Sequence, residues 1–233
     1  MHLIDARPRL ILPLLLALAA GAVAVAAAFG APQASGALLG KPANAPKPNC
    51  PRDPCFVLAS VTGFQTRAQG VRNPFRVRED GHIVAWQVRM SRPDNAAREF
   101  FGDLFGSPNL GTGPTAQIAI LRRVGKGRFR LMRQSPTVEL SAYYNTSPVI
   151  TLRRPLRVRR GQIVALTTRT WIPNLIASQR IGRSNWRASR PRGKCGANQA
   201  RNAKPHRKDG SVREYGCSFG DRVAYWARFA AES

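Results

Sequence analysis

The chain has 233 residues and carries 37 lysines and arginines against 12 aspartates and glutamates, a formal net charge of +25 at pH 7. This length suits one domain, and the basic balance favours anionic partners such as acidic polymers, anionic lipids or nucleic acid. Only three histidines are present and the acidic residues are scattered, which argues against an active site built on histidine or on paired carboxylates.

The N-terminus has the pattern of an export signal. Arg7 and Arg9 precede an uncharged run of twenty residues, 11–30, and small residues follow it. This predicts a signal peptide over residues 1–37. The run is also long enough to cross a bilayer, so an uncleaved hydrophobic helix that serves as a membrane anchor is the alternative. In both cases we expect the rest of the chain to be extracytoplasmic, because the positive residues stay inside.

A change in composition separates this signal from a domain. Residues 38–49 are rich in proline and alanine, which is typical of a stiff, extended linker. The domain is then expected over residues 50–233.

The domain contains four cysteines, Cys50, Cys55, Cys195 and Cys217. Outside the cytoplasm an even number predicts disulfides, and four cysteines allow three pairings. The pairing of sequence neighbours, Cys50 with Cys55 and Cys195 with Cys217, is favoured because two prolines bend the chain within the first pair. The spacing lacks the C-x-x-C or histidine partners of a metal site, so no metal is predicted.

Apolar and polar residues alternate with a period of two from Phe56 almost to the C-terminus, which predicts short strands. A hairpin is expected over residues 75–90, because Asp80-Gly81 separates two alternating runs. The intervening segment 91–115 predicts one short helix, capped by Asp94.

Three later stretches continue the pattern. A second hairpin is expected over residues 115–135, with its turn at 125–127. A third is expected over 153–168, where arginines alternate with apolar residues before a turn at 160–162. In the last strand, four apolar residues are expected to share one face: Val223, Tyr225, Ala227 and Phe229.

Residues 178–217 differ from the rest in being rich in arginine, lysine and turn-forming residues. They predict a long basic loop inserted before the last strand. Two roles stay open for Trp186 in this loop: stacking on the sugars or bases of a ligand, or packing the loop against the domain. His82 and His206 are both expected to be exposed loop residues. Together these elements predict an all-β fold, a single antiparallel β-sandwich or jelly-roll-like domain with one short helix and the long basic loop.

The candidate ligand-binding residues are arginines of the strand faces and of the basic loop, together with one tryptophan. Guanidinium groups bind phosphate and carboxylate groups with two parallel hydrogen bonds. The alternative is a solvated face that only keeps the strands soluble. The candidates are Arg128, Arg130, Arg157, Arg159, Arg160, Arg183, Trp186, Arg187, Arg190 and Arg192.

No catalytic residue and no cofactor is predicted. The stretch GCSFG at 216–220 matches G-x-S-x-G, but no histidine follows Ser218, and a strand rather than a helix is expected after it. We therefore expect a protein that is not an enzyme.

The layout resembles that of a group of exported proteins of GC-rich bacteria. The likeness covers about residues 55–175 and rests on the start CPRDPC, on strands such as ASVTGFQ and GHIVAWQVR, and on the late stretch PLRVRRGQIVALTT. The resemblance implies a jelly-roll-like β-sandwich and carries no catalytic motif.

The sequence thus predicts an exported, non-catalytic protein that binds an anionic polymer or surface at the cell envelope. The expected partners are an anionic cell-wall polymer, lipid head groups or a polysaccharide, with nucleic acid bound only non-specifically. Salt should weaken such binding strongly. A membrane-anchored structural envelope protein with a protein partner is the alternative, and a carbohydrate-active hydrolase is the least favoured interpretation.

Overall fold

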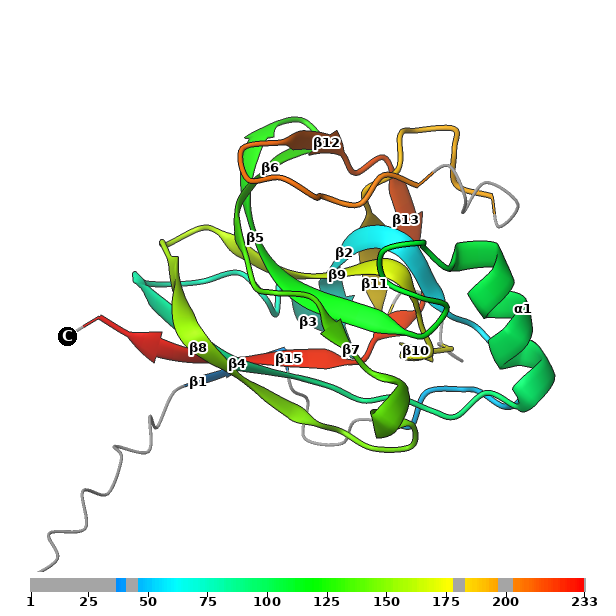
Figure 1. Ribbon diagram of the computed structural model, residues 1–233. Coiled ribbons are helices and arrows are strands. Elements are labelled where there is room, and N and C mark those ends of the chain that lie inside the picture. The colour runs from blue at the N-terminus through cyan, green and yellow to red at the C-terminus, as the bar shows by residue number, and fades with distance from the viewer. Residues whose placement is uncertain (1–36, 41–45, 178–182, 197–202, 233) are drawn as a thin grey trace, which may run out of the picture. The chain divides into compact units, whose positions relative to one another are not determined.

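The computed structural model describes residues 37–40, 46–177, 183–196 and 203–232, all within the compact unit Ala34–Ser233. Apart from Ala37, the predicted signal peptide or anchor lies outside these residues. Within them, no helix is long and apolar enough to cross a membrane. The described chain forms antiparallel, curled sheets with one α-helix, so the predicted all-β, sandwich-like class is confirmed (Figure 1).

Two sheets face each other, and all their neighbouring strands are antiparallel. The smaller sheet has the order β1 (Ala37–Leu39), β15 (Tyr225–Ala231), β4 (Gly81–Val88) and β8 (Val149–Val158). The larger sheet has the order β12 (Val212–Glu214), β6 (Arg128–Gln134), β5 (Thr115–Gly125), β9 (Ile163–Ile172), β2 (Leu58–Ala68), β11 (Asn185–Ala188) and β13 (Cys217–Phe219). Two short strands pair with interior strands of this sheet, β3 (Val71–Arg72) with β2 and β7 (Val138–Glu139) with β5. A separate ribbon pairs β10 (Leu175–Ile176) with β14 (Arg222–Val223).

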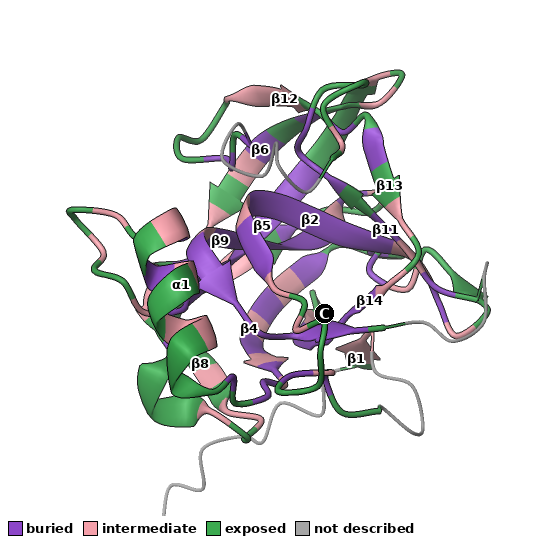
Figure 2. Ribbon diagram, turned by 90° about the vertical axis from the view of Figure 1, so that its right-hand side faces the viewer, coloured by how far each residue is buried: buried purple, intermediate pink, exposed green. Residues whose placement is uncertain are grey.

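The main core lies between the sheets, and β2, β5 and β9 are its most continuously buried strands (Figure 2). Because side chains alternate across a strand, one face of each strand contributes to the core. Of the four apolar residues expected on one face of the last strand, Tyr225, Ala227 and Phe229 lie in β15 and belong to this core, which confirms the prediction for these three. Val223 belongs to the same core but lies in β14. A 3-10 turn over Ser141–Tyr143 precedes β8.

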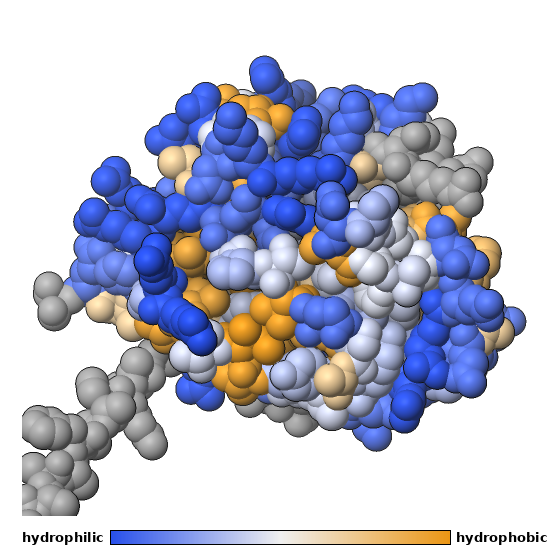
Figure 3. Space-filling view, in the orientation of Figure 1, coloured by the Kyte–Doolittle hydropathy of each residue, from blue (hydrophilic) through white to orange (hydrophobic). Residues whose placement is uncertain are grey.

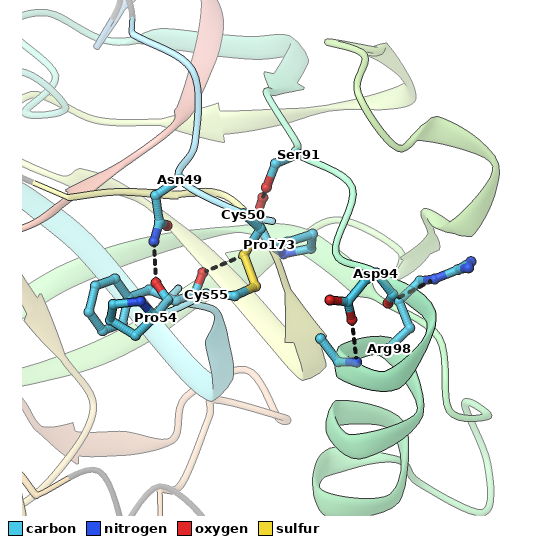
Figure 4. The surroundings of a disulfide bond; sticks show 10 residues. Asn49, Cys50, Pro54, Cys55, Ser91, Asp94, Arg98 and Pro173 are labelled. Atoms are coloured by element: carbon cyan, nitrogen blue, oxygen red, sulfur yellow. Dashed lines mark hydrogen bonds between the residues drawn. A yellow bond between two sulfur atoms is a disulfide. The ribbon is translucent and has the colours of Figure 1, made fainter. Parts of the chain in front are cut away.

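The single helix, α1 (Asn95–Phe105), begins where the sequence predicts it. The Asp94 carboxylate accepts a hydrogen bond of 2.8 Å from the backbone N–H of Ala97 (Figure 4). The helix buries Phe105 against Trp171 of β9. A cap at the first turn and an apolar contact at the last turn thus fix both ends.

We expect Asp94→Ala to lower the free energy of unfolding by about 1 kcal/mol, because the first turn loses its side-chain acceptor. Urea denaturation followed by circular dichroism measures this change. Asp103→Ala is the matched control, since Asp103 is exposed within the same helix and caps nothing. An equal loss in both variants would show that the cap contributes nothing.

Both disulfides join sequence neighbours, so the favoured pairing is confirmed. Cys50 bonds to Cys55 and Cys195 to Cys217, with Cα–Cα distances of 4.6 and 5.4 Å. Figure 4 shows the first bond, beside which the Asn49 side chain donates a hydrogen bond of 2.6 Å to the backbone oxygen of Pro54.

The hairpin predicted over residues 75–90 is wrong. Residues 75–77 pair with the start of β9 instead of β4: Val77 N–H donates to Gln162 O at 2.9 Å, and Val164 N–H donates to Phe75 O at 3.0 Å. Gly81 does not have the positive φ of a two-residue hairpin turn. It is required by a close approach, because a Cβ atom there would lie 2.2 Å from the backbone oxygen of Ala230.

The hairpin predicted over residues 153–168 is also wrong. Strand β8 pairs with β4 in the smaller sheet, whereas β9 pairs with β2 and β5 in the larger sheet. The turn after β8 is therefore an arch that crosses from one sheet to the other. By contrast, β5 and β6 pair around residues 125–127, where Gly127 has a φ of 66°, so that predicted hairpin is confirmed.

Two segments expected to be irregular contribute strands. The predicted linker 38–49 begins inside β1, which pairs with β15. The predicted basic loop 178–217 contains β11, β12 and the start of β13. In the larger sheet β12 and β13 are edge strands, where only one neighbour is a strand, whereas β11 lies between β2 and β13. All three are only three or four residues long, and each has at most two apolar residues. Their composition therefore resembles that of a loop.

Candidate functional site: arginine-lined clefts at the turn between β8 and β9

The arch between the two sheets, residues 159–162, is held rigidly by its backbone. The Arg159 N–H donates to the Gln162 side-chain oxygen at 2.9 Å, and the Arg160 N–H donates to the Asp80 carboxylate at 2.8 Å. Gly161 has a φ of 86°, and its N–H donates to Val77 O at 2.9 Å. Glycine is required at this position because few other residues adopt that conformation. The arch therefore presents its arginine side chains from a fixed backbone.

On one side of the arch lies a cleft of about 440 Å³, which we call the upper cleft. Its volume is within the range of ordinary ligand sites. Residues from β5, β6, β8 and the arch line it: Arg122, Arg123, Met132, Arg133, Arg157, Arg159, Arg160, Gly161 and Gln162. Six of the nine lining residues are arginines, so the cleft is suited to anions.

On the other side of the arch lies a second cleft of about 370 Å³, which we call the lower cleft. Its lining residues are Arg72, Asn73, Arg76, Val77, Arg78, Arg160 and Gly161. Arg160 and Gly161 therefore line both clefts. The segment that contributes Arg76 and Arg78 is held against the arch by the Val77 hydrogen bonds described above.

Few carboxylates balance these arginines. Arg157 binds Glu232 through two nitrogen–oxygen contacts of 3.0 and 3.3 Å. Among the described residues, no other arginine of the two clefts has a salt bridge to a carboxylate. All nine cleft arginines are exposed. The clefts thus concentrate positive charge at one end of the sandwich.

The surface view agrees with this distribution. In Figure 3, hydrophilic side chains gather over the left and upper parts of the molecule, and in the same orientation in Figure 1 the arch between β8 and β9 lies at the left. An apolar area lies below them in Figure 3, where a groove is lined by residues of β4, β7 and β8, among them Trp86, Val138 and Ile150.

Only some of the predicted site residues meet in these clefts. Arg157, Arg159 and Arg160 line the upper cleft. Arg128 and Arg130 lie on β6, where Arg130 is opposite Arg122 in the register, but neither of the two lines the cleft.

The remaining predicted arginines lie on other elements. Arg187 is exposed on β11, where it pairs with Ser218 of β13. Arg192 is exposed near the second disulfide, and Arg183 lines a different pocket, described below.

Trp186 and Arg190 are not available to a large ligand. Trp186 is 4% exposed and stacks on Phe219 with ring centroids 4.8 Å apart. Arg190 is 7% exposed, and its guanidinium carbon lies 5.6 Å from the centroid of the same ring. Burial lowers the pKa of Arg190. Of the two roles open for Trp186, this burial and stacking favour packing, and neither Trp186 nor Arg190 lines one of the two clefts.

Six cleft arginines were absent from the predicted site: Arg72, Arg76, Arg78, Arg122, Arg123 and Arg133. They come from three separate stretches of sequence, which only the sheet pairing brings together. The only sequence feature that pointed to any of them was a pair of arginines at the end of an apolar strand, as in residues 122–123.

The described residues contain no group of three or more histidines, cysteines, aspartates or glutamates that could hold a metal ion. In comparisons with known proteins, no family model, no curated protein and no solved structure matches this chain. The resemblance to exported proteins of GC-rich bacteria therefore stays a prediction.

Proposed function

We propose that this protein is an exported, non-catalytic module that binds an anionic polymer of the cell envelope at the upper and lower clefts. The observation that carries the proposal is the clustering of six arginines around the upper cleft, of which only Arg157 forms a salt bridge within the described part of the chain. The disulfides support an extracytoplasmic location, because such bonds are rare in the reducing cytoplasm.

The arrangement favours a polymer over a single small anion. Arg160 lines both clefts, so one extended chain with repeated phosphate or carboxylate groups can contact arginines on either side of the arch. Each contact releases counterions from the polymer, which makes binding both favourable and salt-dependent. The rigid backbone of the arch limits the entropy lost on binding.

The test is the binding of fluorescent heparin, as a polyanion probe, to the full-length protein in a non-ionic detergent, with salt raised from about 50 to 500 mM. We expect the triple variant Arg133→Gln, Arg159→Gln, Arg160→Gln to bind about 10- to 100-fold more weakly at low salt. The slope of log affinity against log salt should fall in magnitude by up to about 3, because three contacts are lost.

The matched control removes the same charge elsewhere, with Arg128, Arg187 and Arg192 changed to glutamine. These three arginines are exposed and line neither cleft. We expect it to weaken binding by less than about 3-fold, as screening limits the effect of distant charges. Equal losses in the two triple variants would contradict a located site and indicate attraction by net charge alone. Retention of the protein on isolated cell-envelope fractions at low salt then tests whether its natural partner is an envelope polymer.

A further inference from the structure

A second basic site, separate from the two clefts, contains a buried arginine. Arg222 of β14 is 2% exposed. One of its terminal nitrogens, Nη2, donates a hydrogen bond of 3.2 Å to the backbone oxygen of Gly40. The other, Nη1, is buried and has no hydrogen-bond partner among the described residues. A charged group in this state is costly unless a counter-charge is supplied.

Arg222 lines a pocket of about 540 Å³ between the ribbon of β10 and β14 and the start of the domain. Three further cations line the same pocket: Lys47, Arg52 and Arg183. None of the residues that line it is an aspartate or a glutamate. The pocket shares no lining residue with either arginine cleft.

One polar side chain, that of Ser184, can complete an anion site. Ser184 lines the pocket and is buried, and its hydroxyl accepts a hydrogen bond of 3.3 Å from the Gln69 N–H, which leaves its own proton available to donate. Asn49 lines the pocket as well, but its side-chain nitrogen donates to Pro54 O at 2.6 Å and its oxygen can only accept, so it is not counted among the anion ligands.

Burial lowers the pKa of Arg222 but does not remove its charge. Desolvation lowers the pKa of Arg222 from 12.5 to about 10, so the side chain remains protonated at neutral pH. The folded protein therefore holds a buried positive charge that no described carboxylate in its pocket neutralises.

We infer that this pocket binds a phosphate group, with Arg222 as the buried anchor and Arg52, Arg183 and Lys47 around it. A phosphate dianion offers more charge and more acceptor oxygens than a carboxylate, which matches four cations in one pocket. Guanidinium groups bind such oxyanions through their N–H donors, and Nη1 of Arg222 has no other partner among the described residues. The group can belong to inorganic phosphate or to a phosphomonoester such as glycerol phosphate.

The experiment measures thermal unfolding and isothermal titration of the full-length protein in a non-ionic detergent, with inorganic phosphate, glycerol phosphate and acetate as separate probes. We expect phosphate to raise the Tm of the unsubstituted protein and acetate to have at least 10-fold weaker affinity, an order-of-magnitude expectation from the charge difference. Binding of glycerol phosphate at least as tight as that of phosphate would identify a phosphomonoester as the ligand. Tighter binding of inorganic phosphate would identify the free ion.

Arg222→Met tests the anchor. We expect it to lower phosphate affinity by at least about 30-fold, because the buried donor is lost. Without phosphate, its Tm should equal or exceed that of the unsubstituted protein, since an uncompensated buried charge is removed. Arg228→Met, which removes an exposed arginine from β15, is the matched control and should change neither quantity.

Ala177→Glu is a second variant that retains Arg222. Ala177 lines the pocket and follows Ile176, which pairs with Arg222. A carboxylate there should raise the Tm and abolish the response to phosphate. The inference is overturned if phosphate does not bind the unsubstituted protein, if acetate binds equally well, or if Arg222→Met retains full phosphate affinity. Because the heparin test uses other residues, either proposal can fail without the other.

Discussion

Phe75→Ala is expected to lower the free energy of unfolding by about 3–5 kcal/mol, the usual cost of removing a buried aromatic side chain. Phe75 is 1% exposed and stacks on Tyr225 with ring centroids 4.0 Å apart. The Tyr225 hydroxyl donates to Val164 O at 2.9 Å, so the ring pair links the smaller sheet to β9. A Cβ atom on Gly40 would lie 2.1 Å from the Phe75 ring, which shows how closely the backbone covers it.

The same residue connects stability with the proposed site. Phe75 precedes Arg76, which lines the lower cleft. The backbone on both sides of Arg76 is hydrogen-bonded to residues 162–164, where β9 begins. Loss of the ring therefore releases the wall of the lower cleft as well as a core contact. The milder Phe75→Leu keeps most of the volume, and we expect it to fold and to bind heparin several-fold more weakly, an order-of-magnitude expectation from a cleft wall that is less firmly held.

Urea denaturation measures the stability change, and fluorescence anisotropy with labelled heparin measures binding. Phe100→Ala is the control, because Phe100 is 59% exposed and should contribute less than about 0.5 kcal/mol. A Phe75→Ala protein as stable as the Phe100→Ala protein would refute the role of the ring pair.

The second large effect is a loss of stability in acid that depends on one histidine. His206 is fully buried, contrary to the expectation of an exposed loop residue. Its Nδ1 lies 2.8 Å from the Ser211 hydroxyl, and its backbone N–H donates to the Thr62 hydroxyl at 3.0 Å. Burial, with a smaller contribution from Arg213, lowers the pKa of His206 from 6.5 to about 4.

The sign of the pH effect follows from this lowered pKa. The folded protein keeps His206 neutral, whereas the unfolded chain protonates it below pH 6.5. The contribution to stability is therefore fully present above pH 6.5 and is lost as the pH falls towards 4. The shift corresponds to at most about 3 kcal/mol.

Urea denaturation at several pH values between these limits measures the effect. We expect His206→Gln to have a flatter stability profile than the unsubstituted protein over this range. His82→Gln, at a histidine of β4 whose side chain is 38% exposed, is the matched control for the loss of an imidazole. Parallel profiles for the unsubstituted protein and His206→Gln would contradict the assignment.

The local sequence pattern predicted some features of this molecule, whereas others depend on how its strands pair. Hydrophobic alternation identified the strands and the core face of β15, because residues two positions apart in a strand point to the same face of the sheet. The same local rules failed at Asp80-Gly81 and at residues 160–162. A turn sequence indicates that the chain changes direction there. It does not indicate whether the following strand joins the same sheet.

The candidate site shows the consequence of that difference. Arg157, Arg159 and Arg160 were identifiable because they are close in sequence and alternate with buried residues. Arg122 and Arg133 join them only because β5 and β6 pair beside the end of β8. The burial of Arg190 against the Phe219 ring could not be predicted, because arginine is usually exposed and a contact with a ring on another strand is invisible in the local sequence.

The sequence by itself determined the basic character, the all-β class and the helix cap, and it favoured the disulfide pairing that the structure has, since each depends on composition or on residues close together in the chain. The tertiary structure alone decided which arginines share a cleft, which are buried, and that Arg222 lies in a pocket without a carboxylate. The physical reason is that the positive charge gathered in a cleft depends on the distances between arginines on different strands. Those distances are set by how two sheets pack, and not by separation along the chain.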